Sequence, residues 1–193
     1  MARQIAETID LFKAILHDEE KPFAPCLFSS TWNTYQLGAS GFRYYLGPRN
    51  TLHSRLTKQP PSLADILTQA GAPSESVCTQ EQRRQAEKAV IARLASRAPE
   101  MEAGSSHIRL TKLEYGFPIY NARHSKAVIV VIDSDIGWSR KKDGLVYATG
   151  FCSVGNIHVY GKRRGRWQQI HADWGIFASE FGSTHKPVTP EDW

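Results

Sequence analysis

The chain has 193 residues, 41% of them hydrophobic and 22% charged, and it carries a formal net charge of +5. This composition is ordinary for a folded globular protein, and it excludes a disordered tail, a collagen-like rod and a disulfide-dense miniprotein. All apolar runs are shorter than the length that crosses a bilayer as a helix, so we expect no membrane contact, while the basic excess fits an anionic partner.

The cysteines bear on cofactors and compartment. Cys26, Cys78 and Cys152 are few and odd in number, and they lack CxxC spacing. This pattern predicts neither a disulfide framework nor a zinc site, and it favours a reducing compartment. The first residues include acidic side chains where a signal peptide would be apolar. We therefore expect a cytoplasmic protein without metal or other cofactor, although a chain stripped of its signal peptide would look similar.

Three helices are expected in the first half of the chain. Apolar residues recur with helical spacing from residue 5 to residue 16. Ser62 and Gly71 have the positions of an N-terminal cap and a C-terminal stop around a second helix, and a third is expected from about residue 79 to 96. The third helix presents small residues that would suit close packing on a sheet: Ala86, Ala89 and Val90.

Strands are expected after Gly104. The β-branched run at 127–132 predicts a central strand that is buried on both faces. The other strands are expected at 107–120, with interruptions at Gly116 and Pro118, and at 145–154, 157–161 and 166–174. This order predicts an α+β fold, in which N-terminal helices pack on one face of a C-terminal curved antiparallel sheet.

No break in composition divides the chain. We expect a single domain over residues 1–193, mainly helical or irregular at 1–100 and mainly strands at 105–182. In its order of elements, the second half resembles the cystatin-like and nuclear-transport-factor-2-like architectures. The acidic group Asp133-Ser134-Asp135 is expected to form a polar turn at the end of the central strand.

Two turns would determine which side chains of the last strands lie on the same face of the sheet. Gly155-Asn156 predicts a two-residue hairpin, and the segment 162–165 predicts a second, basic one. Alternation then gives one small apolar face, expected to lie against the helices, that includes Cys152, Val154, Ile157 and Val159. The opposite face is aromatic and polar: Tyr147, Thr149, Phe151, Ser153, His158, Tyr160, Trp167, Gln169 and His171.

These features favour a non-catalytic binding protein of the accessory, inhibitor or immunity type that acts through a protein partner. Tyr160 and Trp167 are the expected anchors, because large aromatic residues dominate binding interfaces. Charged residues at the second hairpin would steer association. The full set of predicted binding residues is Tyr147, Phe151, His158, Tyr160, Arg163, Arg164, Arg166, Trp167 and Gln169.

Two alternatives remain. An enzyme with a small-molecule pocket would use His158 and His171 on one sheet face, with Ser153 beside them. A nucleic-acid-binding protein would use the basic hairpin loops at 140–142 and 162–166.

A local pattern bears on the second alternative. Residues 62–77, SLADILTQAGAPSESV, resemble the helix-turn-helix of LacI-type repressors, with Gly71 and Val77 at the family's spacing. Leu67 stands where that family has alanine, and Pro73 stands where it has serine at the start of the recognition helix. The resemblance implies a DNA-binding helix that begins near Ser74.

Overall fold

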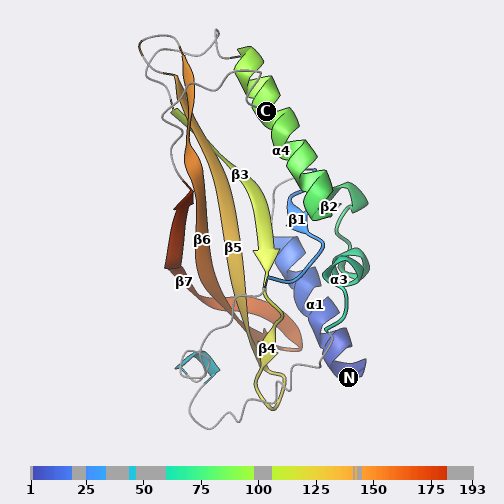
Figure 1. The fold of residues 1–193 in the computed structure, drawn as a ribbon. Helices are drawn as coiled ribbons and strands as arrows, with labels where there is room; N and C mark the ends of the chain where they lie inside the picture. The colour runs from blue at the N-terminus through green and yellow to red at the C-terminus, as the bar shows by residue number, and fades with distance from the viewer. Residues whose placement is uncertain are drawn as a thin grey trace.

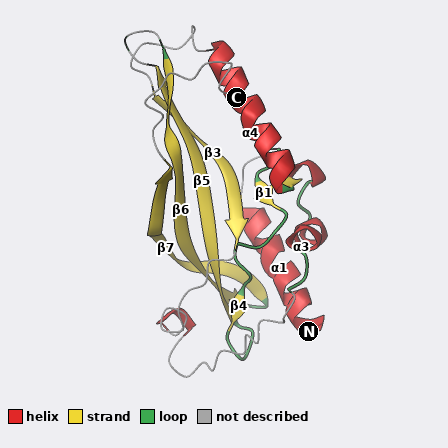
Figure 2. Cartoon of the chain, in the orientation of Figure 1, coloured by secondary structure: helices red, strands yellow, loops and turns green. Residues whose placement is uncertain are grey.

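The computed structural model describes residues 2–18, 25–33, 44–46, 60–97, 106–140, 142 and 145–181. Over these residues the fold is α+β, as predicted, with helices and a mostly antiparallel mixed sheet of seven strands. Figures 1 and 2 show helices α1 (Ala2–Asp18) and α3 (Leu63–Ala70) on one side of this sheet. Within the described ranges, none of the helices combines the length and apolarity required to span a bilayer.

The predicted helices are confirmed. α1 buries Leu11, Phe12, Ile15 and Leu16. Ser62 caps α3 by accepting a hydrogen bond from the Asp65 N–H at 3.5 Å, and Gly71 ends the helix with a φ of +97°. A residue with a side chain is strained at such a φ, which explains the glycine there.

The third predicted helix is α4 (Gln80–Arg97). Thr79 and Gln82 form a reciprocal cap, because the Gln82 N–H donates to Thr79 Oγ1 at 3.3 Å and the Thr79 N–H donates to Gln82 Oε1 at 2.9 Å. Ala89 is exposed, so its expected packing on the sheet is wrong. Val90 lies outside the residues whose side chains are described.

The sheet has the order β2-β1-β3-β5-β6-β7, and β4 pairs with β5. β1 pairs in parallel with β2 and β3, and the other pairings are antiparallel. β5 is the buried central strand that the apolar run predicts, since residues 127–131 are buried. The strand bounds are β1 (Phe28–Ser29), β2 (Val77–Cys78), β3 (Ser106–Tyr115), β4 (Ile119–Tyr120), β5 (Lys126–Arg140), β6 (Val146–Arg163) and β7 (Arg166–Phe181).

The predicted hairpin at Gly155-Asn156 is wrong. β6 continues through these residues, and Asn156 pairs with Val131 of β5. The Asn156 side chain is buried and forms two hydrogen bonds, and its backbone is part of the strand instead of a turn. The predicted turn at Asp133-Ser134-Asp135 is wrong as well, because these residues lie within β5.

The second predicted hairpin is confirmed between β6 and β7. Its two central residues, Arg164 and Gly165, have φ values of +52° and +80°. Positive φ at both positions is the type I′ geometry, which matches the twist of the flanking strands.

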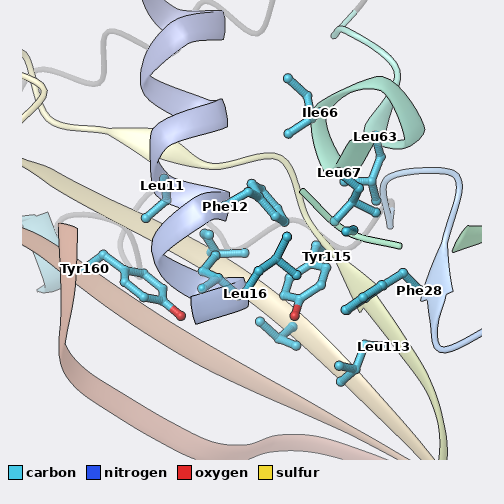
Figure 3. Close-up of a cluster of buried hydrophobic side chains, with 14 of the residues drawn as sticks. Leu11, Phe12, Leu16, Phe28, Leu63, Ile66, Leu67, Leu113, Tyr115 and Tyr160 are labelled. Carbon is cyan, nitrogen blue, oxygen red and sulfur yellow. The ribbon is translucent and has the colours of Figure 1, made fainter. Parts of the chain in front are cut away.

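The main core lies between the sheet and α1, with α3 beside it (Figure 3). We call this side of the sheet the helix face. Tyr160 and Trp167 belong to this core and are only 3% and 5% exposed, so their expected position on an exposed face is wrong. The prediction placed small residues against the helices, whereas large aromatic side chains fill the layer between α1 and the sheet.

A second, smaller cluster lies on the opposite side, which we call the outer face. It contains Leu46, Ile119, Val128, Ile157 and Val159, with Tyr45 packed against it. Val128 alternates with Ile129 of the main core, and Val159 alternates with Tyr160. The helical turn at residues 44–46 covers this cluster, across the sheet from α1 (Figure 1).

Cys26 and Cys78 form a disulfide, contrary to the sequence prediction. The bond holds the start of β1 beside β2, where the Cys26 N–H also donates to the Glu75 carbonyl at 2.9 Å. The two cysteines are 52 residues apart, so local spacing gave no signal. The disulfide removes the argument from cysteine usage for a reducing compartment.

Candidate functional site

The two histidines lie on opposite faces of the sheet, so the predicted pair on one face is wrong. His158 is paired with Ala172 and packs against Tyr160 of the helix face, with ring centroids 6.4 Å apart. His171 is paired with Val159 and contacts Tyr45 on the outer face, at 6.1 Å. A bulge in β7 shifts the register between Val159 and Tyr160, and one extra residue reverses the side to which later residues point.

Ser153 is also separate from His158. It lies opposite Ser134 of β5, and their hydroxyl groups are hydrogen-bonded at 2.9 Å. Because Ser153 and His158 occupy odd and even positions of one strand, they face opposite ways. Ser153 therefore does not have His158 as a base.

A polar cluster on the helix face surrounds the buried Asn156. The Asn156 Nδ2 donates to Asp133 Oδ2 at 2.8 Å, and the Gly175 N–H donates to Asn156 Oδ1 at 3.0 Å. His158 lies beside it, with its ring edge-on to the exposed Trp174 at 5.6 Å. Within the described part of the chain, His158 Nε2 is buried without a hydrogen-bond partner.

Burial controls the charges of this polar cluster. Desolvation, followed by the charge of Asp135, raises the pKa of Asp133 to about 6, and the hydrogen bond from Asn156 partly opposes this shift. Burial also lowers the pKa of His158, which favours the neutral imidazole at physiological pH.

Replacing Asp133 by asparagine should stabilise the protein at neutral pH. An acid whose pKa is raised by folding stabilises the fold most below its unfolded pKa, and this contribution is lost as the pH rises toward 6. The neutral amide of asparagine does not ionise, so this pH-dependent loss of stability disappears, while its carbonyl oxygen still accepts the hydrogen bond from Asn156. Because Asp133 is partly exposed, screening limits the expected gain to about 1 kcal/mol at pH 7 to 8. Urea unfolding should show this gain at pH 8 and little difference near pH 4; an equal difference at both would contradict the assignment.

A second arrangement lies on the outer face. The Tyr45 hydroxyl donates to Asp173 Oδ2 at 2.5 Å, and His171 Nε2 lies 3.1 Å from Asp173 Oδ1. The edge-on ring of Tyr44 packs against Tyr45 at 5.0 Å and is 78% exposed. Ile170 is 40% exposed and lies over Gly161, where a Cβ would come within 3.1 Å of its side chain. We call Tyr44, Tyr45, Ile170, His171 and Asp173 the outer patch.

Hydrogen bonding and charge fix the protonation of Asp173 and Tyr45 in the outer patch. The hydrogen bond from Tyr45, with help from His171, lowers the pKa of Asp173 and keeps it ionised. Desolvation and the contact with Asp173 raise the pKa of Tyr45 to about 12, so its hydroxyl remains a donor. Sequence reasoning included His171 but missed Tyr45 and Asp173. A His-x-Asp pair on one strand could have revealed Asp173, whereas no signal links Tyr45 to β7.

The arginine hairpin is the third feature. Arg163 and Arg166 are direct cross-strand partners around Arg164-Gly165, and all three arginines are exposed. Gln169 is exposed nearby, and its Oε1 accepts from the Tyr160 hydroxyl at 3.5 Å.

Some predicted site residues have no described side chain. Tyr147 and Phe151 lie in β6, but their side chains fall outside the described residues, as does that of Arg140. Lys141 lies wholly outside them. Over the ranges that the structure covers, there is no group of three or more metal-ligating side chains that could hold an ion.

The segment that resembles a helix-turn-helix does not form one. After α3 and Gly71, residues Ser74–Ser76 form a single turn of 3-10 helix, and Val77 begins β2. Leu63, Ile66 and Leu67 of α3 are buried in the core. No α-helix begins near Ser74, so this resemblance gives no support to DNA binding.

Comparisons with known proteins found no similarity that assigns a family or fold relative. No protein-family model matches the chain, and neither the curated proteins nor the solved structures contain a match.

Proposed function

We propose that this protein is a non-catalytic binding protein that docks a protein partner on the outer patch, beside the arginine hairpin. The observation that carries the proposal is the exposure of Tyr44 and Ile170 around a hydrogen-bonded network of Tyr45, Asp173 and His171. The surface differs from the one that the sequence suggested, because Tyr160 and Trp167 are buried and are unsuited as anchors.

The composition of the outer patch suits an interface. Tyrosine supplies a large contact area with few rotatable bonds, and tyrosine and arginine are enriched among residues that dominate binding energy. The bonds from Tyr45 and His171 to Asp173 hold part of the surface in place before a partner arrives. Less conformational entropy is then lost on association.

The rigid sheet supports this surface. Ile170 and His171 lie in β7, and Tyr45 is packed against the buried outer-face cluster that includes Ile157 and Val159. Side chains on a rigid element are positioned more precisely than those on a free loop. A binding surface at this point needs no catalytic nucleophile. The Ser153 hydroxyl, which was a predicted candidate, is hydrogen-bonded to Ser134.

The substitution Ile170→Asp should abolish partner association while changing the free energy of unfolding by less than about 1 kcal/mol, because the side chain is already substantially exposed. Leu145→Asp is the matched control, since Leu145 is a similarly exposed aliphatic residue outside the outer patch. The measurement is a pull-down from host lysate with tagged wild type and variants. The affinity of each for the captured protein is then measured with both proteins purified. Equal retention by wild type and Ile170→Asp would contradict the proposal.

A further inference from the structure

The three arginines of the hairpin are crowded in a way that costs stability. Arg163 and Arg166 lie directly opposite each other across the strands, and Arg164 occupies the turn between them. Like charges at directly opposed positions destabilise a hairpin. In the described structure, no acidic side chain forms an ion pair with any of these three residues. The neighbouring Lys162, by contrast, forms an ion pair with Glu7.

We propose that this hairpin selects an acidic polypeptide segment of the partner, an inference that rests on the protein-binding function proposed above. Guanidinium groups bind carboxylates through paired hydrogen bonds, and a partner's carboxylates would relieve the repulsion among the arginines. The outer patch begins with Ile170, four residues along β7 from Arg166, so an acidic segment can continue onto an apolar and aromatic surface.

The same charges argue against a nucleic acid as the occupant. Affinity for a phosphate backbone grows with the number of phosphates neutralised along it, which requires an extended basic surface. Here three exposed arginines are concentrated in one tight turn, and the carboxylate of Asp173 lies farther along the same strand. A long polyanion would meet that negative charge, whereas a short acidic segment next to apolar residues would avoid it.

The test uses the full chain and a fluorescent random copolymer of glutamate and tyrosine, with binding followed by anisotropy. The arginine variant carries Arg163→Glu, Arg164→Glu and Arg166→Glu. Its control carries Arg84→Glu, Lys88→Glu and Lys142→Glu, which reverse the same number of exposed charges away from the hairpin. We expect the arginine variant to bind the copolymer at least about tenfold more weakly than the control, and added salt to weaken wild-type binding.

Three results would overturn the inference: no binding of the copolymer by the wild type, equal losses in both variants, or tighter binding of oligo-uridylate than of the copolymer. Circular dichroism must show that both variants are folded. The proposed function is judged separately through Ile170→Asp. If Ile170→Asp loses the partner while the arginine variant still binds the copolymer as tightly as the control, the acidic-segment inference alone is contradicted, and the proposed function stands.

Discussion

Replacing Trp167 by alanine is expected to lower the free energy of unfolding by about 3–5 kcal/mol, the range for deleting a buried tryptophan side chain. Trp167 is 5% exposed and lies in the core beneath α1. Its ring packs against Tyr120, with centroids 5.9 Å apart, and the ammonium group of Lys162 lies 4.9 Å from the ring centroid. The substitution would leave a cavity and remove the contact with Lys162.

Urea denaturation of Trp167→Ala measures this loss, and Gln168→Ala is the control because the neighbouring glutamine is exposed. The control should change the free energy of unfolding by less than about 0.5 kcal/mol. A loss below about 1 kcal/mol for Trp167→Ala would contradict the core position. It would also return Trp167 to the set of surface anchors that the sequence suggested.

Removing the Cys26–Cys78 disulfide is expected to lower the free energy of unfolding by about 4 kcal/mol, from the loop-closure entropy of a 52-residue separation. The bond restricts the unfolded chain, and in the folded state it ties β1 to the segment that leads into α4. The double variant Cys26→Ala with Cys78→Ala, and the reduced wild type, should both show this loss.

The double variant provides the internal control for reduction. Dithiothreitol should destabilise the wild type and leave the double variant unchanged. Peptide mapping without reductant should recover the linked peptides from the wild type. Equal stability of oxidised wild type, reduced wild type and double variant would show that the bond does not hold the fold together.

The helices and the central strand were predictable because their signals are local. Ser62 and Gly71 mark the ends of α3 through backbone chemistry that depends on few neighbours. The β-branched run in β5 predicts burial wherever it sits in a sheet. The Arg164-Gly165 turn was likewise predictable, because glycine readily adopts the positive φ that a two-residue hairpin turn requires, as Gly165 does here.

The faces of the sheet were harder to predict because they depend on nonlocal pairing. The sequence Gly155-Asn156 is compatible with a turn, and only the partners Asp133 and Gly175 show why Asn156 remains in a strand. The bulge at the Val159/Tyr160 register shift reverses the side of His171 and has no sequence signal of comparable strength. The candidate site was therefore predicted in part: the arginine hairpin and His171 were named, whereas the contact of Tyr45 with Asp173 depends on tertiary structure.

The most direct test of the binding proposal is site-specific photocrosslinking in host cells, with a benzophenone amino acid placed at position 170 in one variant and at Gln82 in another. Gln82 is exposed on α4 and lies outside the outer patch. We expect position 170 to crosslink to one discrete protein, and position 82 not to yield this product. Absence of a crosslinked protein at position 170, or the same products from both positions, would contradict the proposal that the outer patch docks a protein partner.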